Sequence, residues 1–158
     1  MHIREATPAD SAVLARLNTH VQDVHLAQRP EHFTATDPTA TSEWFGRRLE
    51  EPGAHAWIAE VDERAVGYVL ALRRQSQGNP FTRARTWFEI DQLAVDPAVR
   101  RRGIGRALLR AALAHAREEG LPVEATSWAF NDRTHALFAS LGLTPKVIRF
   151  EQRWSLRD

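Results

Sequence analysis

Apolar side chains recur along this chain with two different spacings, and the first of them predicts helices. Apolar positions three and four residues apart form one face of a helix. Four segments show that spacing: one that starts at Thr7 and Pro8, one from Thr41 or Ser42 to about Pro52, one over 104–118 and one over 131–141. Pro30 and Pro38 interrupt the pattern between 25 and 40, so we predict a loop or a broken helix there.

The second spacing consists of short alternating or continuous apolar runs between turn residues, which is typical of strands. Runs of this kind occupy 3–5, 55–61, 65–72, 86–95, 123–126 and 147–154. Gly78 and Pro80 predict a mobile loop over 75–84. The resulting order is β-α-α-β-β-β-α-β-α-β, with the last strand extended to a hairpin, and this order predicts an α/β fold.

The composition is that of an ordinary globular protein. The 158 residues suit one domain, 1–158, and 43% of them are apolar and 26% charged. The absence of cysteine excludes disulfides, thiolate metal sites and cysteine nucleophiles. We expect no metal site, because His20, His25 and His32 fit no helical ligand pair. Since there is no long apolar run and no signal-peptide pattern, we predict a cytoplasmic protein that does not enter a membrane.

The basic residues are concentrated in one place, although the net charge is only +1. Five of the twenty arginines lie between Arg100 and Arg110, and Lys146 is the only lysine. A chain with almost no net charge is a poor ligand for nucleic acid, so we expect no nucleic-acid partner. The local cluster favours a small anionic ligand.

This arginine cluster coincides with a strand-loop-helix junction at 95–109. The expected strand ends at Val95, and Gly103 and Gly105 open the following helix. A helix N-terminus presents free N–H groups and a partial positive charge, and glycine lets a ligand approach that backbone closely. With the arginines, these features predict a cradle for phosphate or pyrophosphate, although the segment matches neither a Walker A loop nor a dinucleotide-binding fingerprint. On spacing alone, the alternative is a loop with a solvated basic face.

At these residues the chain resembles the GNAT superfamily of N-acetyltransferases. The superfamily signature for acetyl-coenzyme A, Arg/Gln-x-x-Gly-x-Gly/Ala, is matched by Arg100-Arg101-Arg102-Gly103-Ile104-Gly105. A second family segment, in which an Asn meets the coenzyme and a helix ends in Leu-Gly-Phe, is similar to 128–143. The resemblance covers almost the whole chain, and it implies a mixed, mostly antiparallel, twisted sheet flanked by helices.

The resemblance also implies a coenzyme site and a reaction. Backbone groups of 93–95 would hold the pantetheine arm and the thioester, and those of 101–106 would hold the pyrophosphate. The implied set is Leu93, Ala94, Val95, Arg100, Arg101, Arg102, Gly103, Ile104, Gly105, Arg106, Asn131 and Phe138. Acetyl-coenzyme A would be the co-substrate, and the free amine of a small molecule or a peptide would attack its thioester directly.

One position departs from the family pattern. Family members commonly carry a Tyr on the last helix as general acid, four residues before the glycine of the Leu-Gly pair, and this chain has Phe138 there. We favour transfer in which the thiolate leaves without this acid. The alternatives are that Ser140, His135 or Tyr68 replaces the tyrosine, or that the protein is a non-catalytic coenzyme A-binding regulatory module.

Two carboxylates on the strand over 86–95 are candidates for the catalytic base. Glu89 and Asp91 are two positions apart, so they share a face if Ile90 points into the core. On that face, family members often keep a base that acts through water. The alternatives are solvent exposure or ion pairs with Arg83 or Arg85.

Histidine and aromatic residues follow the first helix. His25, Pro30 and Phe33 match the His-x-x-x-x-Pro-x-x-Phe pattern of a subset of GNAT proteins, in which this loop borders the acceptor site. His25 is therefore also a candidate base. The predicted acceptor contacts are His25, Glu31, His32, Phe33 and Trp128. The alternative is that the histidines make ordinary loop hydrogen bonds and that the tryptophan packs in the core.

The apolar terminal strand bears on assembly. Many relatives dimerise through their terminal strands, and 147–154 is apolar enough to do so. We therefore predict that the protein can form a homodimer. The identity of the acceptor is left open, because loops set the substrate in this superfamily.

Overall fold

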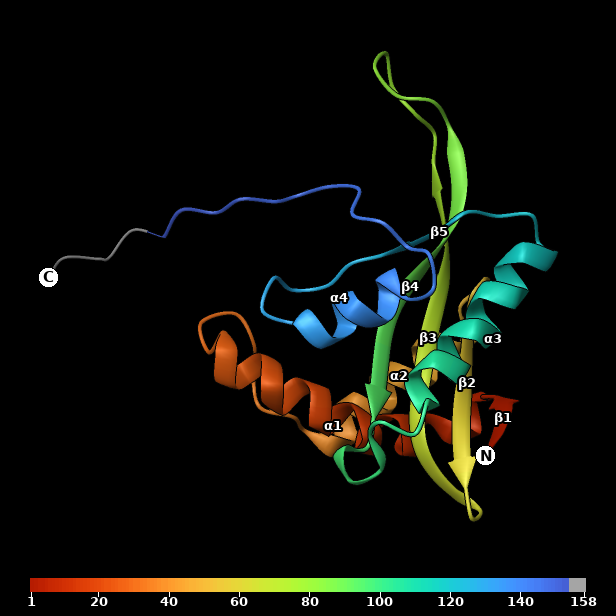
Figure 1. Cartoon of the computed structure of the whole chain (residues 1–158), viewed down its shortest axis with the longest axis vertical. Coiled ribbons are helices and arrows are strands. Elements are labelled where there is room, and N and C mark those ends of the chain that lie inside the picture. Colours follow the sequence, from red (N-terminus) through yellow and green to blue (C-terminus); the bar gives the residue numbers. More distant parts are fainter. Residues whose placement is uncertain (154–158) are drawn as a thin grey trace, which may run out of the picture.

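The predicted strands pair into a sheet of five, as described for residues 1–153 by a computed structural model (Figure 1). The strands are β1 His2–Glu5, β2 Ala54–Val61, β3 Arg64–Ser76, β4 Arg85–Val95 and β5 Val123–Ala125. They pair in chain order and are antiparallel from β1 to β4. The last strand, β5, joins β4 in parallel, because a helical connection carries the chain back across the sheet. This arrangement confirms the predicted fold class.

The helices cover both faces of the sheet. They are α1 Ser11–Gln28, α2 Pro38–Glu50, α3 Ile104–Glu118 and α4 Asp132–Ala139, with single 3-10 turns η1 Pro8–Asp10 and η2 Pro97–Val99. One core, around Leu17, Phe45 and Tyr68, lies between the sheet and the pair α1 and α2. A second core, around Phe88 and Leu108, lies on the other face under α3. Within residues 1–153, no helix has both the length and the apolar character that crossing a membrane requires.

Three helices differ from their predicted limits, and the smallest difference is in α4, which was predicted over 131–141 and covers Asp132–Ala139. Where we predicted a loop, α1 continues to Gln28 and stops before Pro30, which disfavours a helical residue in front of it. The second helix begins at Pro38, earlier than predicted, because Asp37 caps it. The Asp37 carboxylate accepts a hydrogen bond from the Ala40 N–H at 2.9 Å.

The loop predicted over 75–84 is shorter than expected. Strands β3 and β4 extend into a long hairpin that projects beyond the rest of the sheet (Figure 1). Asn79 closes its tip, since its side-chain oxygen accepts hydrogen bonds from the N–H groups of Phe81 and Thr82. Asn79 and Thr82 also exchange two backbone hydrogen bonds, and together these local bonds hold the turn.

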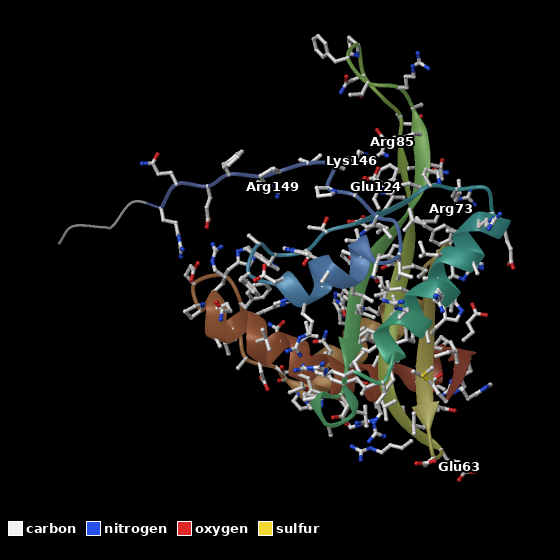
Figure 2. The ribbon with its side chains drawn as sticks, viewed as in Figure 1. Glu63, Arg73, Arg85, Glu124, Lys146 and Arg149 are labelled. Carbon is white, nitrogen blue, oxygen red and sulfur yellow. The ribbon has the colours of Figure 1, made fainter. Side chains whose placement is uncertain are left out.

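The predicted terminal strand is wrong for the residues that the structure describes. Residues 143–153 form no helix or strand, and Trp154 lies outside the described part of the chain. The segment leaves the sheet beside β5, where Lys146 and Arg85 both bind Glu124 (Figure 2). Its exposed apolar side chains are Val147, Ile148 and Phe150. An alternating pattern forms a strand only where a neighbouring edge satisfies the backbone, and this path meets none within residues 1–153.

Gly67 lets β3, β4 and α3 approach one another closely. A Cβ atom at this position would lie 2.8 Å from the carbonyl oxygen of Ala94 and 3.2 Å and 3.3 Å from side-chain atoms of Leu108 and Ile104. The carbonyl belongs to a paired strand and cannot move aside. Glycine is therefore required where the end of β4 meets the start of α3.

Gly67→Ala is expected to lower the free energy of unfolding by about 2 kcal/mol, the cost of overpacking a core. Gly46→Ala is the matched control. In α2 the added methyl would meet no atom closer than 3.9 Å, so helix propensity should raise stability by about 0.5–1 kcal/mol. Urea unfolding followed by circular dichroism measures both. Equal effects of the two substitutions would contradict the steric explanation.

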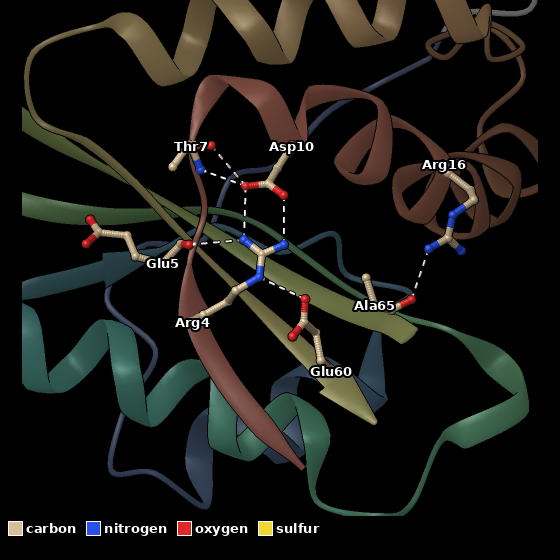
Figure 3. Close-up of polar contacts among 7 residues, drawn as sticks. All are labelled: Arg4, Glu5, Thr7, Asp10, Arg16, Glu60 and Ala65. Carbon is tan, nitrogen blue, oxygen red and sulfur yellow. Dashed lines mark hydrogen bonds and ion pairs between the residues drawn. The ribbon is translucent and has the colours of Figure 1, made fainter. Parts of the chain in front are cut away.

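Arg4 ties β1 to η1 and β2 (Figure 3). Its guanidinium donates to both carboxylate oxygens of Asp10, at 2.7 Å and 3.0 Å, and to Glu60 at 2.8 Å. Asp10 also accepts a hydrogen bond from the Thr7 N–H at 2.8 Å. The hydrogen bond from Arg4 lowers the pKa of Asp10 to about 2. This network holds the first strand against the start of α1.

Asp10→Asn is expected to lower the free energy of unfolding at neutral pH by about 1.5–3 kcal/mol, the range of hydrogen bonds to a charged group. Because the folded-state pKa of Asp10 is below the ordinary aspartate value of about 3.9, its contribution is complete above that value and is lost as the pH falls through about 2. Urea unfolding at about pH 7, 4 and 2 tests this, with Asp23→Asn on the exposed side of α1 as the control. A stability difference from the wild type that stays constant across these pH values would refute the linkage.

Candidate active site

A cleft of about 340 Å³ opens between the second half of α1, β4 and the segment that joins β5 to α4. Figure 1 shows α4 beside β4, between α1 and α3. The lining residues are Asn18, Val21, Gln22, His25, Phe33, Tyr68, Ile90, Asp91, Gln92, Leu93, Thr126, Ser127, Trp128, Asn131, Thr134 and Phe138. The cleft therefore joins the loop after α1 to the two segments that the sequence singled out.

A bulge in β4 shapes the floor of this cleft. Leu70 of β3 pairs with Gln92, whereas the next residue, Ala71, pairs with Ile90, so Asp91 has no partner residue on β3. An extra residue of this kind breaks the alternation of side chains and bends the strand. Ile90 packs into the core under α3, and Gln92 instead points toward α1. The bulge thereby keeps Asp91 and Gln92 on the same side of the sheet.

The end of β4 is open on its β5 side. Strand β5 pairs only with residues 88–90 of β4, and residues 91–95 have no partner there within the described chain. The Asp96 N–H bonds to the Val66 carbonyl on the β3 side. Because N–H groups alternate along a strand, those of Leu93 and Val95 face the open side. The free N–H groups of Leu93 and Val95 lie in the segment for which the family resemblance implies contacts with the pantetheine arm.

Glu89 and Asp91 share a face, as predicted, and both approach Arg74. The Arg74 guanidinium lies 2.9 Å from a Glu89 oxygen and 3.8 Å from an Asp91 oxygen. Only Asp91 lines the cleft. The predicted alternative partners of Glu89 are not used, since Arg85 binds Glu124 instead. Burial raises the pKa of Asp91, although Arg48 and Arg74 oppose that shift.

Three polar side chains form a network at the inner end of the cleft. The Tyr68 hydroxyl donates to Oε1 of Gln92 at 2.6 Å, and the Asn18 amide donates to Tyr68 and Gln92 at 2.9 Å and 3.1 Å. Tyr68 is fully buried, and burial raises the pKa of its hydroxyl. The network fixes the Gln92 amide, so that its N–H₂ group remains free to donate within the cleft.

Aromatic rings form the outer wall. His25, on the last turn of α1, stacks on Phe33 with centroids 4.8 Å apart, and Phe33 lies 5.3 Å from Trp128. His32 approaches Trp128 from outside at 4.9 Å. Burial lowers the pKa of His25 and so favours the neutral imidazole. The predicted acceptor loop and Trp128 are thus brought together, although they are distant in sequence.

An ionic cluster ties the terminal segment to this wall. The Arg29 guanidinium lies 5.0 Å from the centre of the Trp128 ring and binds Glu31 at 2.6 Å and Glu151 at 2.9 Å. Arg153 also binds Glu31, at 3.0 Å. Hydrogen bonding from Arg29 lowers the pKa of Glu31. Glu31 is therefore engaged in the rim and is not among the residues that line the cleft.

The predicted phosphate cradle lies at the start of α3. Gly103 has φ +76° at the helix N-cap, and a Cβ there would meet no atom within 4 Å. The N–H groups of 101–106 have no backbone acceptor in the described part of the chain. Arg100, Arg101 and Arg102 are exposed around them. This surface can receive an anion.

Close packing connects the cradle to the cleft. A Cβ at Gly105 would lie 3.2 Å from Leu137 of α4 and 3.7 Å from Val95 of β4. Arg106 donates to the Ser140 hydroxyl at 3.1 Å, across the same α3–α4 junction. Phe138, which follows Leu137 in α4, lines the cleft.

Several predicted residues therefore meet in one place, and others do not. Those that line the cleft are His25, Phe33, Asp91, Leu93, Trp128, Asn131 and Phe138. Asn131 also caps α4, because its side-chain oxygen accepts a hydrogen bond from the Thr134 N–H at 3.3 Å. Glu89 lies next to the cleft, His32 lies behind Phe33 and Trp128, and the Ala94 side chain is buried under α1.

The polar residues of the cleft were not predicted from the sequence. They are Asn18, Gln22, Gln92, Thr126, Ser127 and Thr134. A signal existed on α1, because Asn18, Gln22 and His25 are spaced to share one helix face with apolar Val21. No signal existed for Gln92, since strict alternation would have placed it on the opposite face.

Of the three suggested substitutes for the missing tyrosine, only Tyr68 lines the cleft. Its hydroxyl already donates a hydrogen bond to Gln92. The Ser140 hydroxyl donates to the Leu137 carbonyl at 2.7 Å, and His135 is exposed beside Asp132. The cleft thus presents Phe138 where family members commonly have an acid.

Comparison with known proteins agrees with this geometry. Residues 19–143 match the model of the Acetyltransferase (GNAT) family. N-acetyltransferase 8 of Homo sapiens is 36% identical over 97 residues, which are 60% of this chain and 41% of that protein. N-alpha-acetyltransferase RimI of Mycobacterium tuberculosis is 34% identical over 110 residues, which are 70% of this chain and 64% of that protein. The matched regions span less than two thirds of either relative.

A solved structure extends the likeness to the whole described fold. The tetramutant of BH1408 protein from Bacillus halodurans superposes with a TM-score of 0.90 at 26% identity, over 98% of this chain and 100% of that one. The family match includes the open end of β4, the start of α3 and the cleft residues from Val21 to Phe138. The chain therefore belongs to the acetyltransferase (GNAT) family.

Proposed function

We propose that the protein transfers the acetyl group of acetyl-coenzyme A to the amine of a small molecule or peptide. The observation that carries this proposal is the open end of β4. Residues 91–95 of β4, which are unpaired on the β5 side in the described chain, run from Asp91 in the cleft toward the free N–H groups at the start of α3. A thioester along this edge would face an amine in the cleft.

The residues along this edge fit such a coenzyme. The α3 N-terminus offers free N–H groups and a partial positive charge for a pyrophosphate, and Arg100, Arg101 and Arg102 add charged donors. Leu93 and Val95 offer backbone N–H groups that can hold an extended amide-containing arm and polarise a carbonyl oxygen. When bound, acetyl-coenzyme A supplies the acetyl group as a thioester.

Asp91 is the base in this proposal. An alkyl ammonium must lose a proton before its nitrogen can attack, and Asp91 is the carboxylate that lines the cleft. Burial raises the pKa of Asp91 and so narrows the gap to the much higher pKa of an ammonium group. His25, whose neutral form is favoured by burial, accepts a hydrogen bond from the acceptor and positions it.

Departure of the thiolate proceeds here without a proton from position 138: the C–S bond breaks after the C–N bond has formed, and the second proton that the nitrogen loses passes to water. The phenyl ring of Phe138 has no proton to donate, and Tyr68 is committed to Gln92. A thiol has a pKa of about 8.5, so its anion is a tolerable leaving group near neutral pH.

The test is release of coenzyme A from acetyl-coenzyme A, followed with a thiol reagent against a panel of amines. The protein contains no cysteine, so it gives no background signal. Amine-dependent release, with the acetylated amine identified by mass spectrometry, is expected. Calorimetric binding of acetyl-coenzyme A with no release for any amine would instead support the coenzyme A-binding regulatory module that Phe138 suggests.

A further inference from the structure

The acceptor end of the cleft has aromatic walls. Phe33 and Trp128 approach each other with ring centroids 5.3 Å apart at 68°, and His25 stacks on Phe33 with an interplanar angle of 27°. All three side chains line the cleft and are only half-buried. Part of each ring is therefore available to a ligand, and a flat apolar group would remove the most ring surface from water.

The same cleft carries very little charge. Asp91 is the one carboxylate among the lining residues of the described chain, and no Lys or Arg lines it. At the rim, two arginines pair with two glutamates through contacts of 2.6 Å to 3.0 Å. These rim residues are Arg29, Arg153, Glu31 and Glu151. Asp91 is therefore the one acidic group that the described cleft offers a ligand, and Arg74, which does not line the cleft, lies 3.8 Å from its carboxylate.

The size of the cleft also favours a small acceptor. Its volume of about 340 Å³ lies at the small end of the range of about 300–1,000 Å³ that is usual for ligand sites. The acetyl end of the coenzyme needs part of that space. A compact acceptor fits what remains, whereas a sugar of several rings would extend beyond it.

We propose that the acceptor is a primary monoamine whose ammonium group lies beside Asp91 and whose flat apolar group lies against Phe33 and Trp128. This inference rests on the proposed function. A free arylalkylamine and the N-terminal aromatic residue of a peptide share this chemistry. A polyamine or an aminoglycoside would bring further ammonium groups into a cleft without a second carboxylate, and burying an unpaired charge is costly.

The test compares four amines: 2-phenylethylamine, the amide of the dipeptide Phe-Gly, spermidine and kanamycin. Calorimetry with coenzyme A present measures binding, and coenzyme A release measures kcat/KM. We expect the two aromatic monoamines to bind and react at least about tenfold better than the two polycations. The ratio between the two monoamines distinguishes a free amine from a peptide terminus.

Substitutions then locate the contact. Trp128→Ala is expected to raise the Kd and KM of the preferred monoamine about tenfold, and Trp128→Phe to restore most of the affinity. Trp87→Ala is the matched control, because Trp87 also lies under an arginine, with Arg85 4.0 Å from its ring centre, but outside the cleft. Thermal unfolding verifies that each variant is folded, and Phe33→Leu provides a second, milder change in the same wall.

The outcomes separate this inference from the proposed function. If an aromatic monoamine binds through Trp128 but no amine is acetylated, the acceptor chemistry stands and the transfer activity fails. If spermidine or kanamycin is acetylated better than both monoamines, transfer stands and the acceptor chemistry is overturned. The inference is also overturned if none of the monoamines binds, or if Trp128→Ala and Trp87→Ala have equal effects.

Discussion

Asp91→Asn is expected to lower kcat/KM for the acceptor amine by about 10²–10³, the usual contribution of a positioned general base. The substitution keeps the size of the side chain and removes its ability to accept a proton from an ammonium group. Glu89→Gln is the matched control, because Glu89 binds the same arginine but does not line the cleft. Initial rates of coenzyme A release across pH measure both. A larger loss in Glu89→Gln than in Asp91→Asn would assign the base to Glu89 instead.

The pH profile gives this prediction a second readout. The base must be ionised, so kcat/KM falls as the pH drops below the pKa of Asp91. Because burial raises that pKa, the acid limb lies above the ordinary aspartate value of about 3.9. Arg74 opposes the shift, so Arg74→Gln is expected to move the limb to still higher pH. An acid limb that is unchanged in both Asp91→Asn and Arg74→Gln would show that another group titrates.

Stability is expected to move in the opposite direction from activity. The folded-state pKa of Asp91 is above its unfolded value, so the ionised carboxylate opposes folding at neutral pH. That cost decreases as the pH falls through the raised pKa. The unfolding temperature of Asp91→Asn at pH 7 should therefore be equal to or higher than that of the wild type, which excludes misfolding as the cause of a lost rate.

Gly103→Ala is expected to weaken binding of acetyl-coenzyme A about 10- to 100-fold, the value of one or two hydrogen bonds to a charged group. Gly103 has φ +76°, which an alanine adopts at a cost of about 1–2 kcal/mol. Relief of that strain rotates the adjoining peptide groups, and these carry the N–H donors of the cradle. Titration calorimetry with coenzyme A measures the change.

Gly120→Ala provides the control for strain alone. Gly120 has φ +66° after the other end of α3, and a Cβ there would also meet no atom within 4 Å. The two positions are about 25 Å apart along the helix axis. Both variants should lose similar stability, and only Gly103→Ala should lose coenzyme affinity. Equal losses of affinity would mean that the α3 N-terminus does not hold the coenzyme.

The elements with strong local signals could be predicted well from the sequence. The helix over 104–118 has a sharp apolar face, Gly103 before it and Gly120 after it, and α3 has these limits in the structure. The strand over 86–95 differs from β4 by one residue. Helix starts at proline were harder, because Pro38 indicates a break as readily as a first helical position. For the terminal segment, in contrast, the apolar pattern predicted a strand that does not form over the described residues, because no strand edge lies beside it there.

One part of the candidate site could be predicted from the sequence, and the other part could not. The motif at the start of α3 is local: residue order alone places glycines, arginines and free N–H groups at one helix end, so the cradle could be predicted from the sequence. The cleft is formed by segments that are far apart in the sequence. Phe33 meets Trp128 only through the packing of α1 and its loop against the segment before α4, and no sequence spacing encodes that contact.

The choice between the two candidate carboxylates depends on how β4 pairs with its neighbouring strands. Glu89 and Asp91 are equivalent by alternation, and both reach Arg74. The bulge opposite β3 and the end of the β5 pairing at Ile90 are properties of neighbouring strands, and together they direct Asp91 and Gln92 into the cleft. Local spacing thus determines the family motif and the glycine- and arginine-rich start of α3, whereas strand register and helix packing determine which side chains line the cleft, because contacts between distant segments set them.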